Sequence, residues 1–216
     1  MLLTSVVETS NAISATTKRL QKTDLLATLL RRLSPEEVEI VVAWLSGATR
    51  QGAIGVGYAT LRAASAPPSA SPTLEILTVD LTFSELAVVK GSGSEQRRRE
   101  LLHSLFGRAT EIEQRFIVGV LGGELRQGAL QGIMLEAIAK AAGIDVEHVR
   151  RASMMAGSIQ AIARPSLERG EAGSAEFDIR LFRPVQPMLA QSAEDVATAL
   201  KDLGEASIEY KFDGAR

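Results

Sequence analysis

Residues 25–53 read LLATLLRRLSPEEVEIVVAWLSGATRQGA, and this stretch decides the fold because a second copy of it lies 76 residues farther along the chain. Without a gap, it aligns with residues 101–129, LLHSLFGRATEIEQRFIVGVLGGELRQGA. The last four residues of both copies are identical: Arg50-Gln51-Gly52-Ala53 and Arg126-Gln127-Gly128-Ala129. Four identical residues at the end of one ungapped register indicate an internal duplication.

Each copy predicts two helices separated by a short break. Apolar residues recur at helical spacing ahead of residue 34. Ser34-Pro35-Glu36-Glu37 is typical of a helix start, with an N-cap serine, a proline at the first helical position and acids in the first turn. The second helix is expected to run to about Leu45 and to stop at Gly47, a plausible C-terminal glycine. We therefore expect a duplicated helix–turn–helix unit over about residues 24–54 and 100–130.

The chain between and after the two copies also has mostly helical periodicity. We expect one helical stretch from residue 94 to 121 with one break, and further helices over residues 129–142 and 146–162. Residues 73–83 alternate only weakly between apolar and polar, so they fit either a strand or a helix. The first part of the chain is therefore predicted to be mainly α.

The texture of the sequence changes near residue 170. Residues 169–174 are rich in glycine and poor in apolar residues, which predicts a linker. Beyond it, residues 177–182 and 206–212 alternate as strands do, and residues 192–203 resemble a capped helix. We therefore expect a helical domain over residues 1–170. Residues 171–216 would hold the linker and then the first strands and helix of an α+β domain.

Two further features are expected to be structural. Arg97-Arg98-Arg99 is a charge run on a predicted helix, and such runs usually mark a solvated helix face. Trp44 lies on the apolar face of a predicted helix just before the glycine break, which favours a place in the core.

The composition excludes several kinds of site. Among 216 residues there is no cysteine, which excludes disulfides, thiolate zinc sites and cysteine nucleophiles. Two histidines exclude a three-histidine metal site. The formal net charge of -2 gives no general attraction for nucleic acid, so DNA binding would need a local basic patch. No apolar run approaches a membrane span and no signal peptide is evident. We expect a cytoplasmic protein without a membrane partner, and a monomer.

The repeated loops suggest a partner. An approximate two-fold axis would place two similar loops on one face, and duplex backbone has approximate two-fold symmetry too. Glycine admits close backbone approach, free N–H groups at a helix start favour phosphate, and arginine adds a forked charged donor. The alternative is that the glycines only end helices and the arginines only cover carbonyl groups. The candidate DNA-binding residues are Arg50, Gln51, Gly52, Arg126, Gln127 and Gly128.

The final segment of the sequence carries a lysine motif, Glu209-Tyr210-Lys211-Phe212-Asp213-Gly214-Ala215-Arg216. It resembles motif I of the covalent nucleotidyltransferases, which comprise DNA ligases, RNA ligases and mRNA capping enzymes. Pro187-Met188-Leu189-Ala190 resembles the stretch that enters the adenylation domain of ATP-dependent DNA ligases. Residues 123–129 resemble the signature of the helical DNA-binding domain that precedes it in archaeal, eukaryotic and some bacterial ligases. The resemblance to ATP-dependent DNA ligases covers residues 3–216.

The resemblance implies a site and its cofactors. Lys211 would attack the α-phosphate of ATP and carry AMP, which requires an unprotonated amine. Glu209 would face the adenine amino group, and Arg216 would contact the ribose or help to hold the nick. ATP and Mg²⁺ are the implied cofactors, with the metal ligands outside this chain. Nicked double-stranded DNA is the implied partner, in DNA repair, replication or recombination.

Three expectations about function follow from this comparison. Because the family's later motifs are absent before the chain ends at Arg216, we expect this chain alone to be inactive. An RNA ligase or a capping-type nucleotidyltransferase is the first alternative function, although the long helical region ahead of the lysine argues against it. A non-enzymatic helical interaction module is the second, and burial of the repeated loops would favour it.

Overall fold

The computed structural model describes residues 1–125, 131–182, 184–185 and 193–206. The chain divides into two compact units, Met1–Gln186 and Pro187–Arg216. Within the described residues, the regular secondary structure is helical apart from one isolated antiparallel bridge between Leu2 and Glu75. The mainly α prediction is therefore confirmed.

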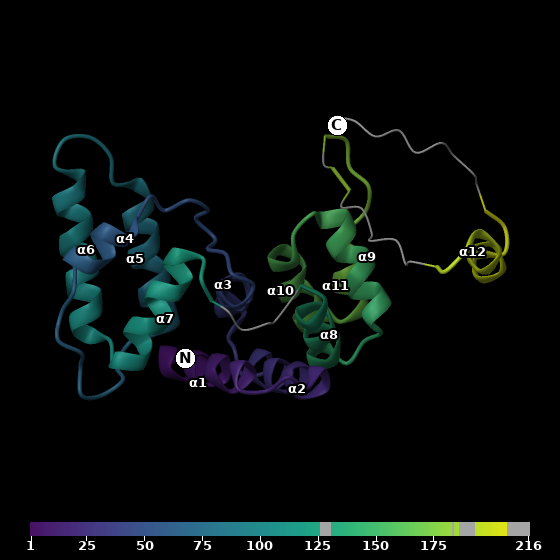
Figure 1. Ribbon diagram of the computed structural model, residues 1–216, viewed down its shortest axis with the longest axis horizontal. Helices are drawn as coiled ribbons and strands as arrows, with labels where there is room; N and C mark the ends of the chain where they lie inside the picture. The colour runs from purple at the N-terminus through teal and green to yellow at the C-terminus, as the bar shows by residue number, and fades with distance from the viewer. Residues whose placement is uncertain (126–130, 183, 186–192, 207–216) are drawn as a thin grey trace. The chain divides into compact units, whose positions relative to one another are not determined.

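The first unit is built from helices of five to fifteen residues. In Figure 1, α3 lies between a group formed by α4 to α7 and a group formed by α8 to α11, while α1 and α2 run along one side. In chain order the helices of this unit are α1 (Leu3–Ser14), α2 (Arg19–Leu30), α3 (Pro35–Leu45), α4 (Tyr58–Ala63), α5 (Ile76–Val88), α6 (Ser94–Arg108), α7 (Glu111–Gly122), α8 (Gln131–Ala142), α9 (Val146–Ala156), α10 (Ile159–Arg169) and α11 (Glu171–Ala175).

The two copies of the repeat start their second helix in the same way. The backbone N–H of Ser34 donates to Glu37 at 2.9 Å ahead of α3. At the equivalent place ahead of α7, the backbone N–H of Thr110 donates to Glu113 at 2.8 Å. Both pairs form a capping box, in which the helix start satisfies backbone groups that the helix itself leaves unpaired. The start predicted for the helix at residue 35 is confirmed, and its counterpart shares the same chemistry.

The same two helices also end alike. Gly47 follows α3 with φ of 79°, and Gly123 follows α7 with φ of 66°. This left-handed conformation has no steric cost for glycine, so the chain turns sharply away from each helix at its glycine.

The helices around the repeat pack reciprocally. α2, the first helix of the first copy, packs on α8, which follows the second copy. α6, the first helix of the second copy, packs on α4, which follows the first copy. This exchange of neighbours is consistent with an approximate two-fold relation between the copies.

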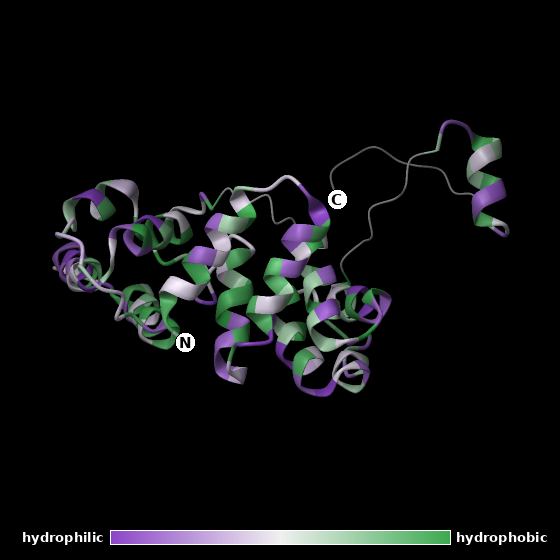
Figure 2. Ribbon diagram, turned by 90° about the horizontal axis from the view of Figure 1, so that it is seen from below, coloured by the Kyte–Doolittle hydropathy of each residue, from purple (hydrophilic) through white to green (hydrophobic). Residues whose placement is uncertain are grey.

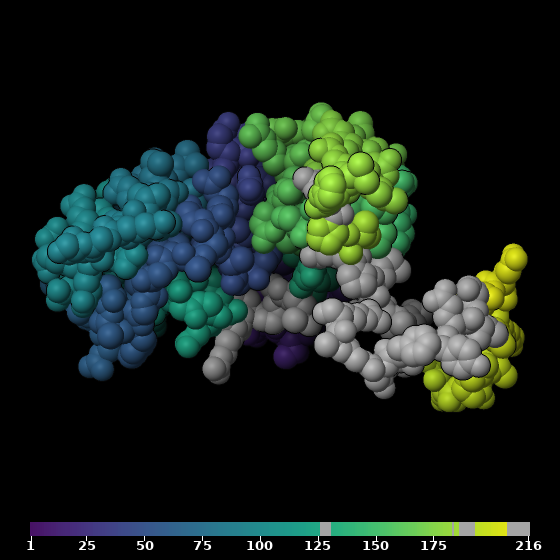
Figure 3. Space-filling model, turned by 90° about the horizontal axis from the view of Figure 1, so that it is seen from above, coloured from purple at the N-terminus to yellow at the C-terminus, as the bar shows by residue number. Residues whose placement is uncertain are grey.

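The core of the first unit centres on Trp44, which is fully buried. Its ring meets Phe83 of α5 at 5.7 Å and Phe116 of α7 at 6.3 Å between centroids, both in edge-on geometry. Hydrophobic and hydrophilic residues alternate along the helices (Figure 2), and the purple-blue region that contains α3 lies between the teal and green groups in Figure 3. The core position predicted for Trp44 is confirmed.

Residues 73–83, whose pattern fitted either a strand or a helix, are helical from Ile76 onward and form the first part of α5. The bridge at Glu75 orders the chain just ahead of the helix, and the helix then buries one apolar face. The buried apolar residues of α5 are Ile76, Val79, Phe83 and Leu86. Their spacing of three and four residues is that of a helix buried on one side.

The glycine-rich residues 169–174, predicted to be a linker, instead comprise the last residue of α10, the junction at Gly170 and most of the packed helix α11. α11 contacts both α9 and α10, and its Ser174 is buried. The Ser174 hydroxyl lies 2.9 Å from the Ser166 hydroxyl of α10, so the two buried groups satisfy each other. Small residues permit this close approach, and their composition resembles that of a loop. The first compact unit continues beyond residue 170, to Gln186.

Residues 177–182, predicted to be a strand, have no regular secondary structure and end in a turn at residues 181–182. A strand requires a neighbour to which its backbone groups can bond, and no strand lies beside them in the described part of the chain. The strand predicted at residues 206–212 lies outside the described residues from residue 207 onward.

The described residues of the second unit contain one helix, α12 (Val196–Leu203). Asp195 caps it, since its carboxylate accepts from the backbone N–H of Thr198 at 2.7 Å. The helix predicted for residues 192–203 is therefore present, with a later start. Across both units, no described helix has the length and apolar character that a bilayer crossing requires.

Candidate nucleic-acid interface

An open groove of about 600 Å³ lies where the two equivalent helices α3 and α7 end. Its described lining consists of residues 47–49, 52–57 and 120–123, all of them glycine, threonine or aliphatic. The groove therefore joins the junction that follows α3 to the junction that follows α7. Because none of these lining residues is charged, the groove presents mainly backbone groups and small side chains to a ligand.

The backbone that lines the groove carries N–H groups that can donate to a ligand. Along residues 53–57, no backbone N–H donates to an acceptor within the described part of the chain. Where solvent reaches them, amides without a protein acceptor bond to water or to a ligand, and successive N–H groups of this kind form a favourable surface for anions. The groove can therefore accept phosphate oxygens without using a charged side chain.

Arg50, predicted to bind DNA, is anchored inside the protein. Its Nε donates to Oδ1 of Asp80 at 3.4 Å, and its Nη2 donates to Oδ2 of the same carboxylate. The Asp80 side chain on α5 is only 4% exposed, whereas that of Arg50 is 37% exposed. The hydrogen bond that Arg50 donates to Asp80 raises the pKa of Arg50 above its ordinary value. The arginine is thus a charged anchor with one part still open to solvent.

Gln51 is anchored to the same helix. Its Nε2 donates to the backbone carbonyl of Asp80 at 3.2 Å, to Oδ1 of Asp80 at 3.0 Å and to the Ser84 hydroxyl at 2.9 Å. Together with Arg50, it fixes the junction after α3 against α5. Asp80 is a site residue that sequence reasoning missed. The available signal was a single acid on a helix face that is otherwise apolar.

Gly52 differs from its predicted surroundings. It is exposed, but its N–H donates to the carbonyl of Thr49 at 3.1 Å, and α4 begins only at Tyr58. The expected free amide at a helix start is therefore not found at Gly52. The available amides lie in the residues that follow it, because the chain turns once before it runs along the groove.

Several predicted site residues lie outside the described part of the chain. They belong to the second copy of the repeated motif and to the lysine motif. These residues are Arg126, Gln127, Gly128, Glu209, Lys211 and Arg216.

The arginine run at residues 97–99 only partly matches its prediction as a solvated helix face. Arg97 is exposed and lies 3.7 Å from Glu100, as such a face would have it. Arg98 and Arg99, however, are half-buried. The side of α6 that carries them turns toward neighbouring elements, which a count of charges could not indicate.

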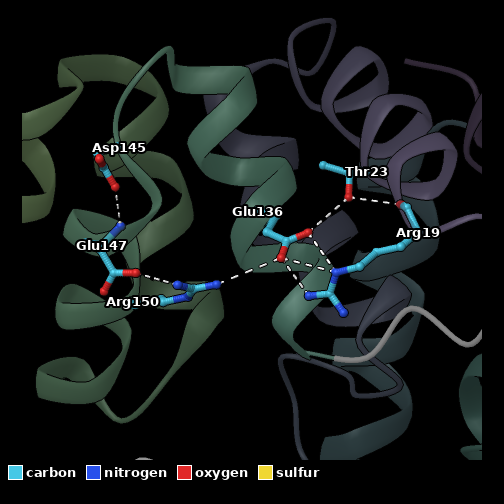
Figure 4. A network of polar contacts seen from close by, with 6 residues as sticks. All are labelled: Arg19, Thr23, Glu136, Asp145, Glu147 and Arg150. Carbon is cyan, nitrogen blue, oxygen red and sulfur yellow. Dashed lines mark hydrogen bonds and ion pairs between the residues drawn. The ribbon is translucent and has the colours of Figure 1, made fainter. Parts of the chain in front are cut away.

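A network of polar contacts holds α8, the helix that follows the second copy (Figure 4). Glu136 of α8 accepts from Nη2 of Arg19 at 2.6 Å and from the Thr23 hydroxyl at 3.4 Å. On its other side it lies 3.9 Å from Arg150 of α9, which also pairs with Glu147. The hydrogen bond from Arg19 lowers the pKa of Glu136 below its ordinary value. Glu136 thus ties α8 to both α2 and α9.

Replacing the carboxylate in Glu136→Gln is expected to lower the free energy of unfolding at pH 7 by about 0.5–1 kcal/mol, because two half-exposed arginines, Arg19 and Arg150, lose their shared charged partner. The folded-state pKa of Glu136 is depressed, so its contribution is present above the unfolded value of about 4.3 and is lost as pH falls through the folded value. Urea unfolding at several pH values should therefore show parent and variant converging in acid. Glu147→Gln, at an exposed i,i+3 pair, is the control and should change little. Equal stability of parent and Glu136→Gln at pH 7 would contradict this account.

Comparison with known proteins places this arrangement in a family. The family model described as DNA ligase N terminus matches residues 56–139. A probable DNA ligase of Nocardia farcinica is 48% identical over 217 residues, which cover 100% of this chain and 42% of that protein. A probable DNA ligase of Saccharopolyspora erythraea is 48% identical over 216 residues with the same coverage, and one of Anaeromyxobacter dehalogenans is 47% identical over 220 residues, 43% of its length.

This chain belongs to the DNA ligase family. It spans about 42% of the length of the curated relatives that it matches.

Proposed function

We propose that this chain is the DNA-holding part of an ATP-dependent DNA ligase that works in the cytoplasm. In this proposal it binds the backbone of nicked duplex DNA at the two repeat junctions, without sequence preference. The observation that carries the proposal is the groove that joins the ends of α3 and α7. Two equivalent junctions beside one groove suit a ligand whose two strands are themselves related by an approximate two-fold axis.

The groove suits phosphate contacts better than base contacts. Among the described residues, the amides of residues 53–57 have no acceptor, and the lining has no large polar side chain that would distinguish one base from another. Contacts to phosphates position a protein on a duplex but do not read its sequence. Arg50 has two roles in this proposal. It fixes the junction by holding Asp80, and its exposed part contributes positive charge at the groove.

The lysine motif supports the proposed chemistry. The unprotonated amine of Lys211 attacks the α-phosphate of ATP, displaces pyrophosphate and holds AMP through a phosphoramidate bond. The AMP then passes to the 5′-phosphate at the nick, and the 3′-hydroxyl displaces it as the strands join. By resemblance to the family, Glu209 would face the adenine amino group, and Arg216 would contact the ribose or help to hold the nick. Mg²⁺ is the metal that this chemistry would use.

The role of Lys211 can be tested in a protein of its relatives' full length. Incubation with ATP and Mg²⁺ should add the mass of AMP to the peptide that contains Lys211, and Lys211→Ala should abolish the addition. Adenylylation that persists at another residue of the Lys211→Ala variant would contradict the assignment.

DNA binding can be tested in this chain. The double variant Arg50→Gln/Arg126→Gln is expected to weaken binding to nicked duplex by a similar factor on every sequence and, because Asp80 compensates the charge of Arg50, to reduce the slope of log K against log salt by about one. Fluorescence anisotropy at several salt concentrations measures both effects. Arg164→Gln, which removes an exposed charge paired with Glu168 on α10, is the control and should bind like the parent.

Three outcomes would weaken the proposal. Unchanged binding by the double variant would remove the repeat junctions from the interface. Tighter binding to RNA duplex than to DNA would favour an RNA ligase or a capping-type enzyme. A parent chain that binds no duplex would favour a helical interaction module that contacts another protein.

A further inference from the structure

The cations that could attract phosphate to the groove must lie beside it and not in its lining. Its described lining is uncharged, so any attraction for phosphate must come from cations beside it. Arg50 is near, but the buried carboxylate of Asp80 compensates its charge. Arg97 is compensated by Glu100. Arg98 differs from both, since no carboxylate of the described residues lies within 4.0 Å of it.

Arg98 reaches from α6 to the rim of the groove. Its Nη2 lies 3.5 Å, and its Cζ 3.8 Å, from the position that a Cβ would occupy on Gly55. Gly55 lines the groove and has φ of 72°, a conformation that other residues adopt only with strain. The glycine thus permits the backbone turn and leaves the guanidinium group beside Gly55, within the segment 53–57 whose amides have no acceptor among the described residues.

The guanidinium group is also held in a fixed place. Its Nη2 donates to the carbonyl of Val89 at 2.8 Å, directly after the end of α5. Its Nε is buried and has no hydrogen-bond partner among the described residues. A half-buried cation that has no counter-ion among the described residues is unfavourable by itself, and a phosphate beside it would compensate the charge. Because the side chain is already anchored, it would lose little conformational freedom on binding.

We infer that Arg98 binds a phosphate of the DNA backbone together with the amides of residues 53–57. This inference rests on the proposed DNA-binding function, and it extends the interface from the repeat junctions to α6. It also separates two kinds of arginine near the groove. Arg50 chiefly shapes the loop through Asp80, whereas Arg98 provides the uncompensated charge.

A purely structural role for Arg98 makes a different prediction. Its bond to Val89 covers a carbonyl at the C-terminal end of α5, where a cation is also favoured by the helix dipole. If that were its only role, removing Arg98 would change stability but would not change how DNA binding depends on salt. The salt dependence counts the cations that contact phosphate, so it distinguishes the two roles.

The experiment compares Arg98→Gln with Arg97→Gln in this chain, using a fluorescent nicked duplex at several salt concentrations. Arg98→Gln is expected to weaken binding about tenfold at low salt and to reduce the salt slope by about one. Arg97→Gln is expected to keep the affinity within about twofold of the parent's and to leave the slope unchanged. Arg98→Lys retains the charge and should retain the slope. If Arg98→Gln binds with the parent's affinity and slope, the inference is wrong, although the proposed function stands. If the parent itself does not bind duplex, both are wrong.

A second pair of variants tests the same contact if Arg98→Gln does not fold. Gly55→Asp and Gly55→Asn have nearly the same shape and the same backbone requirement, but only aspartate supplies a carboxylate beside Arg98. Gly55→Asp is expected to bind nicked duplex more weakly and with a slope smaller by about one than Gly55→Asn. Equal slopes for the two variants would overturn the inference.

Discussion

The edge-on packing of Trp44 against Phe83 and Phe116 is the contact on which the rest of this structure depends. It joins α3, in the first copy of the repeat, to α7, in the second copy, and to α5, which lies between the two copies in the sequence. Aromatic pairs in this geometry contribute about 0.5–1.5 kcal/mol each beyond the burial of their surface. Trp44 lies one turn before Gly47, where the chain leaves the helix and enters the groove. The rings therefore fix the place at which both junctions meet.

Beyond Trp44, side chains hold the first junction in place, and the backbone that follows lines the groove. Arg50 and Gln51 both bond to Asp80, a buried acid that would be costly to leave without partners. Their bonds hold the loop, and the following residues run along the groove with amides that have no acceptor in the described part of the chain. In the proposed function, the conspicuous polar residues of the repeated motif thus act mainly by positioning the backbone. Charge that is free to attract DNA comes from a different helix.

Local signals in the sequence predicted the local structure well. The capping residues Ser34 and Glu37 and the turn at Gly47 act through neighbours a few residues away, so their pattern sufficed to predict the helix boundaries. The repeat register extended the same predictions to residues 110–123. The composition of residues 169–174 was misleading, because small residues serve both loops and closely packed helices.

Contacts between distant parts of the chain could not be predicted in the same way. Nothing in the residues near Arg50 indicates that its partner is Asp80, thirty residues later, or that Arg98 lies beside Gly55. The alternation at residues 177–182 indicated a strand, but strand formation depends on a partner elsewhere. The lysine motif, by contrast, was recognisable as a short pattern, and its role remains a proposal from resemblance.

The central claim is that two equivalent junctions hold the backbone on both sides of a break in one strand. Hydroxyl-radical footprinting of this chain on a duplex with a single nick tests it most directly. The account predicts protection of the sugar–phosphate backbone on both sides of the nick, at similar distances from it and independent of the flanking sequence. Protection on one side only, or protection that follows a particular sequence rather than the nick, would contradict it.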